Sequence, residues 1–273
     1  MLPTIKLGSY DITRLIIGGN PFSGNSHVSQ EMDNDMEDFF TTEQIKQTLF
    51  RCEECGINTM QIRADRHIFR VLREYRAEGG TMRWIAQTAS EMLSFEGHIQ
   101  QLMRNKPEAV YLHGTFTDMA WKSGDVDEIK RRLGIIRAAG CLVGLGTHMP
   151  AVIERAEEEA WDLDFYMACV YNLSKVERVS SAITGVSNES EPFDATDPPL
   201  MYETIRRASK PCLAFKILAA ARRCGTKEEV QGCFDEAFAN IKETDGVVVG
   251  MYPKHTDQVT ANARHALDAI GKL

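Results

Sequence analysis

Most histidines in this chain follow short apolar segments rather than lying within amphipathic ones. Imidazole titrates near neutral pH and is a common metal ligand, so it serves both acid–base catalysis and metal chemistry. Random placement would scatter histidines over helical stretches as well, so their clustering predicts a catalytic face. Five of the seven histidines belong to this group: His27, His67, His113, His148 and His255.

His113 and His148 each directly follow a short apolar run. If these runs are adjacent strands, the two imidazoles lie side by side, and we expect Asp65 and His67 to add a carboxylate and a third imidazole. Three protein ligands with an open position suit a divalent metal acting as a Lewis acid. The alternative is a hydrogen-bonded pair of structural histidines, because no H-x-H or H-E-x-x-H spacing occurs.

Lys216 ends the apolar run Cys212–Phe215 and is followed by two further apolar residues. Burial lowers the pKa of a lysine, which suits Schiff-base or general-base chemistry. A carboxylate or phosphate anchor and a paired structural lysine are the alternatives. Lys254 and His255 open the last expected helix, where backbone N–H groups favour an anion. We therefore take His113, His148, Lys216 and Asp65 as the catalytic candidates.

The elements that must position these residues are eight short apolar runs alternating with amphipathic stretches. Apolar runs bounded by turn residues are typical of parallel strands that are covered on both faces. The expected strands are Leu15–Gly18, Thr59–Ile62, Trp84–Ala86, Ala109–Leu112, Leu142–Leu145, Phe165–Val170, Cys212–Phe215 and Gly246–Val249. The expected helices span residues 42–55, 67–78, 91–104, 125–139, 150–160, 198–208, 226–242 and 255–271.

Eight strand–helix units over residues 1–273 predict a single (β/α)₈ barrel domain, for which about 250 residues is typical. A doubly wound open sheet is the alternative, but the absence of a composition break favours closure. Lys6–Ile12 is expected to form a hairpin that plugs the amino-terminal end. Residues at the carboxyl ends of barrel strands point into the cavity mouth. We therefore expect substrate-binding side chains among Asn20, Arg63, Gln87, Tyr171 and Asn172.

Two connections are longer than usual. Residues 21–41 carry five acidic side chains, and residues 173–199 are rich in Ser, Glu, Asp and Pro. Loops of this length in compact domains are commonly lids or binding loops, and both leave the expected active-site face. A solvated surface is our interpretation of the acidic run, because no charge-binding spacing repeats within it.

The overall charge bears on the class of partner. Lys and Arg number 31 against 39 Asp and Glu, giving a net charge of −8, which disfavours nucleic acid and anionic membranes. The opening residues 1–6 show no basic segment followed by an apolar one, and no later run approaches ~18 apolar residues, so we expect a cytoplasmic protein. The expected partner is a small-molecule substrate, and a homo-oligomer stays open.

Short fragments along nearly the whole chain share one order with a known family of enzymes. The fragments are Leu7-Gly8, Arg14–Gly19, Gly56–Asn58, Leu112-His113, Tyr171-Asn172 and Gly250 with Gln258-Val259 and Asn262. In these fragments the chain resembles aldo/keto reductases. This resemblance implies the barrel fold and a nicotinamide cofactor across its mouth. It also implies that Asn262 contacts adenine and that Lys254 lies near the phosphate of NADP.

The chain departs from the family where the family's chemistry resides. Of the tyrosine, lysine, aspartate and histidine that this chemistry needs, only the histidine carries over, as His113. Gln61 stands in the place of the aspartate, no tyrosine follows in residues 63–67, and Gln87 or Thr88 stands in the place of the lysine. Hydride transfer therefore does not follow from the fold.

Contacts to the cofactor are also replaced. Thr147 and His148 stand where the family holds the carboxamide, Ala168 replaces a glutamine, and Phe215 replaces a stacking tyrosine. We therefore expect an enzyme of this ancestry that acts on a small polar carbonyl or sugar-like substrate by His/Lys acid–base or metal-assisted chemistry. An atypical NADP-dependent reductase is the first alternative, and a non-catalytic ligand-binding barrel is the second.

Overall fold

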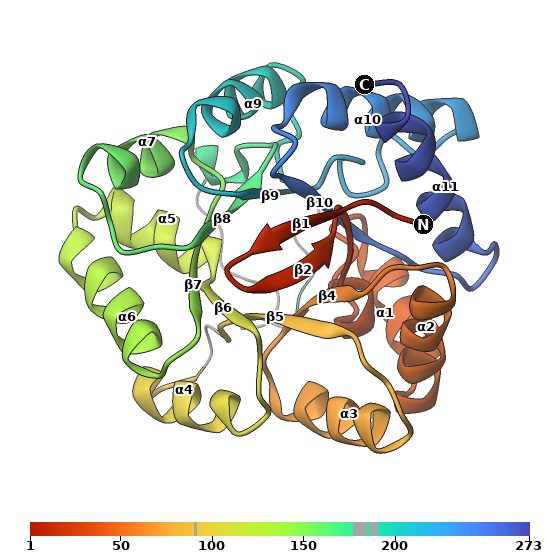
Figure 1. Ribbon diagram of the computed structural model, residues 1–273, viewed down its shortest axis with the longest axis horizontal. Coiled ribbons are helices and arrows are strands. Elements are labelled where there is room, and N and C mark those ends of the chain that lie inside the picture. The colour runs from red at the N-terminus through yellow and green to blue at the C-terminus, as the bar shows by residue number, and fades with distance from the viewer. Residues whose placement is uncertain (90–91, 177–183, 185, 187–190) are drawn as a thin grey trace.

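Eight parallel strands close into one barrel in the order β10-β3-β4-β5-β6-β7-β8-β9 (Figure 1). This computed structural model describes residues 1–89, 92–176, 184, 186 and 191–273. The strands are β3 (Leu15–Gly18), β4 (Thr59–Arg63), β5 (Arg83–Gln87), β6 (Ala109–Leu112), β7 (Leu142–Thr147), β8 (Phe165–Cys169), β9 (Cys212–Phe215) and β10 (Gly246–Gly250). All eight expected runs are therefore strands, and the closed barrel is confirmed.

Helices form a ring outside the strands (Figure 1). The α-helices are α1 (Gln30–Phe39), α2 (Thr42–Glu54), α3 (Arg66–Ala77), α4 (Phe95–Met103), α5 (Gly114–Lys122), α6 (Val126–Ala138), α7 (Pro150–Glu158), α9 (Asp197–Arg207), α10 (Lys227–Asn240) and α11 (Gln258–Ile270). Two short 3₁₀ turns, η1 (Pro21–Ser23) and η2 (Leu173–Lys175), follow β3 and β8. Each expected helix has a counterpart, although residue 91 of one expectation lies outside the described residues.

Two helices were not expected from the sequence. In α1 the Ser29 side chain accepts a bond from Met32 N, and Glu31 and Asp33 occupy the first turn. Capping and negative charge at a helix start both stabilise it, so the acidic run that we interpreted as solvated surface contains a helix. The other unexpected helix, α5, begins directly after His113 with no side-chain cap. Part of the second long connection, residues 177–183, 185 and 187–190, lies outside the described residues.

The amino-terminal hairpin consists of β1 (Thr4–Leu7) and β2 (Tyr10–Thr13), paired antiparallel. Its turn contains Gly8 at φ +57°, a left-handed conformation that glycine adopts without strain. Leu7 and Ile12 are buried, and they pack with residues that fill the barrel interior, including Phe165. Figure 1 shows the hairpin lying across the near end of the barrel. The hairpin therefore plugs the amino-terminal end, as expected.

Barrel closure joins the first barrel strand to the last. β3 and β10 pair in parallel, with Val248 opposite Ile16. Just before β3, Arg14 donates from Nε to the Asp245 carbonyl and from Nη2 to the Lys242 carbonyl, both at 2.9 Å. Its guanidinium also lies 5.0 Å from the ring centroid of Phe238. These bonds satisfy a buried charge with backbone oxygens at the seam.

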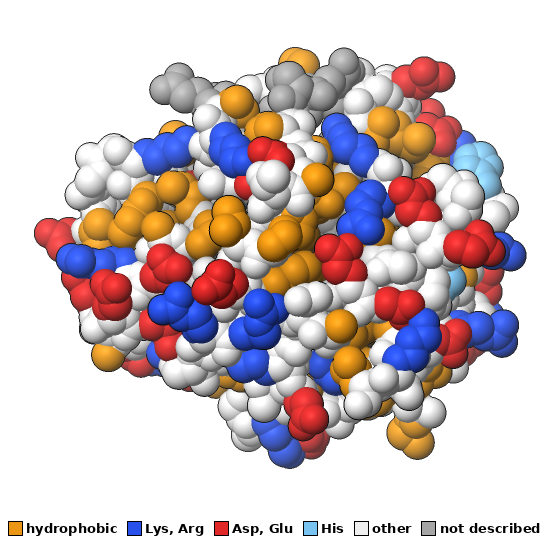
Figure 2. All heavy atoms as spheres, turned by 90° about the horizontal axis from the view of Figure 1, so that it is seen from above, with side chains coloured by type: hydrophobic (Ala, Val, Ile, Leu, Met, Phe, Trp, Pro, Cys, Tyr) orange, Lys and Arg blue, Asp and Glu red, His pale blue; other side chains and the backbone are white. Residues whose placement is uncertain are grey.

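Surface charges of both signs are mixed. Figure 2 shows Lys and Arg side chains interspersed with Asp and Glu over the face that it displays. Within the described part of the chain, no helix combines the length and the apolar character that crossing a membrane requires.

Candidate functional site

The floor of the barrel mouth is an uncharged hydrogen-bonded triad. Gln61 Nε2 donates to the Tyr111 hydroxyl at 2.8 Å, and that hydroxyl donates to Gln87 Oε1 at 2.6 Å. Tyr111 is 4% exposed and packs with the residues of the barrel interior. Burial raises the pKa of Tyr111 well above its ordinary value, so its phenol stays protonated. Of these three residues, we had singled out only Gln87 as a substrate-binding candidate.

A carboxylate from α5 holds the imidazole of His148 at the end of β7. Asp118 Oδ2 lies 2.7 Å from His148 Nδ1, and both side chains are almost fully buried. The carboxylate also accepts bonds from Thr147 Oγ1 at 2.5 Å and from Ser174 Oγ at 2.6 Å. Burial alone would raise the pKa of Asp118, but the bonds from His148, Ser174 and Thr147 lower it below its ordinary value. Asp118 therefore stays ionised near neutral pH.

Glycines allow this close approach between β6, α5 and β7. A Cβ on Gly146 would lie 2.8 Å from the Leu112 carbonyl oxygen, and one on Gly114 would lie 3.1 Å from His148 Cε1. A larger residue at Gly146 would push the two strand ends apart. His113, which precedes Gly114, donates its backbone N–H to Thr88 Oγ1 at 3.0 Å. The ends of β6 and β7 thus place the backbone of Gly114, the residue after His113, beside the His148 imidazole.

Lys216 follows β9 on the same rim. Its neighbour Phe215 contacts the His148 ring edge-on, with centroids 5.8 Å apart. Lys216 Nζ lies 5.8 Å from the ring centroid of Phe193. Its backbone is left-handed at φ 64°, and Ala219, Ala220 and Ala221 share this conformation. Strained backbone of this kind is concentrated at functional sites in proteins.

Segments far apart in the sequence meet over the mouth. Arg222 Nη2 donates to the His27 carbonyl at 2.9 Å, and its guanidinium lies 4.1 Å from the Phe193 ring centroid. His27 Nδ1 lies 2.8 Å from Glu191 Oε2, and His27 Nε2 lies 3.1 Å from Asn20 Nδ2. The expected substrate ligand Asn20 is therefore linked through His27 to Glu191.

Tyr171 and Asn172, two further substrate-binding candidates, make contacts that shape the site. The Tyr171 ring packs on Phe193 with centroids 5.2 Å apart, and burial raises the pKa of Tyr171. Asn172 Oδ1 accepts a bond from Ser174 N at 3.2 Å. Asn172 thus positions Ser174, which in turn binds Asp118.

The proposed metal ligands do not gather as the sequence suggested. Asp65 Oδ1 caps α3 by accepting from Ile68 N at 2.9 Å, and Asp65 Oδ2 lies 3.4 Å from Arg63 Nε. His67 is exposed in the first turn of α3. Across residues 1–89, 92–176 and 191–273, no three His, Cys, Asp or Glu side chains are arranged to hold a metal ion. The metal hypothesis gains no support from this donor set.

The expected phosphate contact is paired within the chain. Lys254 Nζ donates to Asp35 Oδ1, and the Tyr252 hydroxyl donates to Asp35 Oδ2. These two bonds lower the pKa of Asp35. The rings of Phe39 and Tyr252 lie 5.3 Å apart, so α1 is held against the segment after β10. Asn262, the expected adenine contact, is buried in α11 at 6% exposure.

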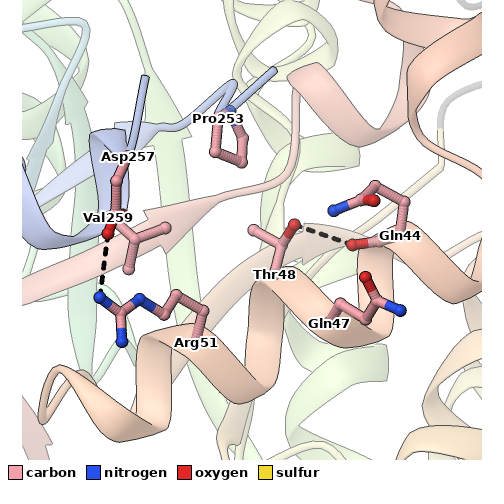
Figure 3. A pocket seen from close by; sticks show the side chains of 7 residues that line it. All are labelled: Gln44, Gln47, Thr48, Arg51, Pro253, Asp257 and Val259. Atoms are coloured by element: carbon pink, nitrogen blue, oxygen red, sulfur yellow. Dashed lines mark hydrogen bonds and ion pairs between the residues drawn. The ribbon is translucent and has the colours of Figure 1, made fainter. Parts of the chain in front are cut away.

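A polar pocket of about 230 Å³ lies outside the barrel, between α2 and the start of α11 (Figure 3). Arg51 spans it and donates to Asp257 Oδ2 at 2.9 Å, so its charge is paired within the chain. None of the residues at the barrel mouth lines this pocket. We therefore treat the pocket as separate from the candidate site, which we assign to the mouth. The lining residues are Gln44, Gln47, Thr48, Arg51, Pro253, Asp257 and Val259.

No protein-family model and no curated protein matches this chain. Among solved structures it is similar to an aldo-keto reductase from Bacillus halodurans, at 12% identity over 100% of this chain and 96% of that chain, with a TM-score of 0.58. It is also similar to a truncated 3-deoxy-D-arabino-heptulosonate 7-phosphate synthase from Thermotoga maritima, at 14% identity, 99% and 90% coverage, and a TM-score of 0.57.

A third similar structure is a glycerol dehydrogenase from Gluconobacter oxydans, at 10% identity over 98% of this chain and 89% of that chain, with a TM-score of 0.56. At identities this low the likeness shows the fold alone. The aldo/keto reductase type of barrel, which the sequence fragments indicated, is thus among the folds that this chain resembles.

Proposed function

We propose that this chain is an enzyme that transfers protons to and from a small polar carbonyl or sugar-like compound. The observation that carries the proposal is the 2.7 Å contact between His148 Nδ1 and Asp118 Oδ2 at the barrel rim. A carboxylate that binds one ring nitrogen fixes the tautomer and stabilises the imidazolium that forms when the other nitrogen takes a proton. His148 Nε2 is therefore the atom at which we place proton exchange.

The reaction that fits these groups is abstraction of a proton from the carbon next to a carbonyl. The C–H bond breaks, His148 Nε2 takes the proton, and the electron pair moves onto the carbonyl oxygen. A cationic or N–H donor near that oxygen stabilises the developing charge. Lys216 and His113, from the rims of β9 and β6, are the groups that we assign to this role.

Hydride transfer of the aldo/keto reductase kind has less support. Gln61 stands where that family has its aspartate, and Gln87 or Thr88 stands where it has its lysine, so neither charged residue is there to tune a tyrosine acid. Lys254 is also bound to Asp35. The proton-transfer proposal needs neither NADP nor a metal.

Solvent exchange tests the proposal directly. Small hydroxy-aldehydes, hydroxy-ketones and aldoses are incubated with the protein in D₂O, and loss of the C–H signal next to the carbonyl is followed by NMR. We expect exchange by the wild type, and a loss of ~100-fold or more in His148→Gln, since positioned acid–base groups contribute about 10²–10⁴-fold.

The matched control is His265→Gln. This histidine lies on α11, where Nδ1 contacts Gln231 Oε1 at 2.6 Å, and it should retain wild-type exchange. Equal exchange in wild type and His148→Gln would overturn the proposal. Turnover that strictly requires NADP would favour the reductase instead.

A further inference from the structure

The two amides of the barrel floor each keep one polar group after binding Tyr111. Gln61 uses Nε2 and Gln87 uses Oε1 for the tyrosine, which leaves Gln61 Oε1 as an acceptor and Gln87 Nε2 as a donor. Neither atom bonds to another side chain in the described part of the chain. Neither is among the polar atoms that are buried without a partner, so both reach solvent.

The solvent that they reach lies at the mouth. The hairpin fills the opposite end of the barrel with Leu7 and Ile12, so accessible surface on inward residues opens only at the carboxyl ends of the strands. Gln87 is the last residue of β5, and Gln61 lies in β4, two residues before its end. Both groups therefore face the carboxyl end of the barrel, the end at which His148 follows β7 and Lys216 follows β9.

The amide groups that remain free would be one oxygen and one NH₂ whichever way the two hydrogen bonds to Tyr111 run. A phenol has one hydrogen, so it donates to one amide oxygen and accepts from the other amide nitrogen. If both amides were turned, their roles would exchange, yet one oxygen and one NH₂ would still face the cavity. The floor presents one acceptor and one donor in either case.

The charged residue beside this pair in the sheet has an acidic partner. Arg63, which is opposite Gln87 in the sheet, lies 3.4 Å from the Asp65 carboxylate. The Tyr111 phenol stays protonated because burial raises its pKa. A carboxylate or phosphate bound directly to this floor would gain no counter-charge from Arg63, Tyr111 or the two amides, and giving up its hydration there would be costly.

We infer that Gln61 and Gln87 recognise an uncharged hydroxyl-bearing end of the substrate, such as two adjacent hydroxyls of a sugar-like compound. One hydroxyl donates to the free amide oxygen, and its neighbour accepts from the free NH₂. This inference rests on the proposed function, and it names the substrate class as a neutral polyhydroxy carbonyl compound. Tyr111 is the positioning residue, because its hydroxyl holds both amides in register.

Binding without turnover tests the inference. Glycerol, erythritol and xylitol serve as probes, with glycolate and inorganic phosphate as charged competitors, and binding is followed by saturation-transfer NMR and titration. We expect the longer polyols to bind the wild type. Gln87→Glu should weaken them by ~10-fold, because the carboxylate still accepts from Tyr111 but removes one donor to the ligand. Gln100→Glu, on the exposed face of α4, makes the same charge change and should bind as the wild type does.

Tyr111→Phe is the second variant, and it should also weaken the polyols because it frees both amides to rotate. The inference is wrong if the wild type binds none of the polyols, if it prefers glycolate or phosphate, or if both variants bind polyols unchanged. His148→Gln separates the two proposals: it should bind polyols normally while losing proton exchange. If His148→Gln binds polyols normally and also exchanges protons at the wild-type rate, the proposed chemistry is wrong. The inference that Gln61 and Gln87 recognise hydroxyls would still stand.

Discussion

Asp118 and His148 lie 2.7 Å apart through Oδ2 and Nδ1, although they come from helix α5 and the end of strand β7. The same carboxylate binds Thr147 and Ser174, so four side chains form one buried network. Networks of this kind fix the orientation of their members more strongly than any single bond does. The imidazole is therefore held in one orientation before substrate arrives.

Replacing Asp118 with Asn should lower the turnover rate by ~100-fold or more while changing KM little, because the wrong tautomer of His148 is then favoured. Steady-state kinetics of proton exchange, with kcat and KM measured separately, checks this. A purely structural role would instead lower the amount of folded protein and leave kcat per folded molecule unchanged.

Asp118 should also contribute to the pH dependence of stability. Its folded pKa lies below the ordinary value of ~3.9, so its stabilisation is complete above pH ~4 and is lost as pH falls through the folded pKa. The difference in the free energy of unfolding between wild type and Asp118→Asn should therefore shrink between pH 6 and pH 3, measured by urea titration. Asp127→Asn, on the exposed surface of α6, is the control and should show little change in this difference. A constant gap for Asp118→Asn would contradict the prediction.

The hairpin plug should be a major source of stability. Leu7 is 1% exposed inside the barrel end, so Leu7→Ala should reduce the free energy of unfolding by about 2–5 kcal/mol. Lys6→Ala changes the neighbouring residue, whose side chain is 68% exposed, and should cost far less. Urea unfolding of both variants decides the point, and equal effects would show that the plug is only loosely packed.

The left-handed backbone after β9 predicts that an alanine-to-glycine substitution there has a different effect on stability from the same substitution in a helix. Ala221 has φ 68°, so Ala221→Gly relieves about 1–2 kcal/mol of strain and costs ~0.5–1 kcal/mol of backbone entropy. The variant should therefore be as stable as the wild type or up to about 1.5 kcal/mol more stable. Ala261→Gly, on the exposed face of α11, should lose about 1 kcal/mol. Differential scanning calorimetry measures the stability of both variants. A clear loss of stability in Ala221→Gly, like the loss expected in Ala261→Gly, would contradict the prediction.

The barrel was predictable because its strands are continuous apolar runs separated by capped helices. Thr41 and Thr226 cap α2 and α10 through the spacing that the sequence shows. Helix α5 was missed because it has no cap and follows β6 without a turn. Its buried Asp118 was missed with it, although a single acidic residue inside the apolar stretch around Phe116 and Met119 was a usable signal.

Side-chain partnerships between distant segments could not be predicted. The strand-end rule brought His113, His148 and Lys216 to one rim, because parallel strands share a carboxyl end. It does not say that Lys254 pairs with Asp35, 219 residues away, or that Asp65 turns to cap its own helix. The partner of each polar side chain depends on which other polar groups lie within a few ångströms after folding. The spacing of residues along the sequence does not predict this.

The seam between β3 and β10 also has a consequence for how the chain is made. Arg14 binds the carbonyl of Asp245, 231 residues later, so the first barrel strand waits for its partner during synthesis. At roughly 5–20 residues per second, that wait is about 10–50 s. During this time the β3 edge presents unpaired backbone groups to any passing strand. The nascent chain, unlike the finished barrel, therefore exposes a strand edge that can pair with another chain.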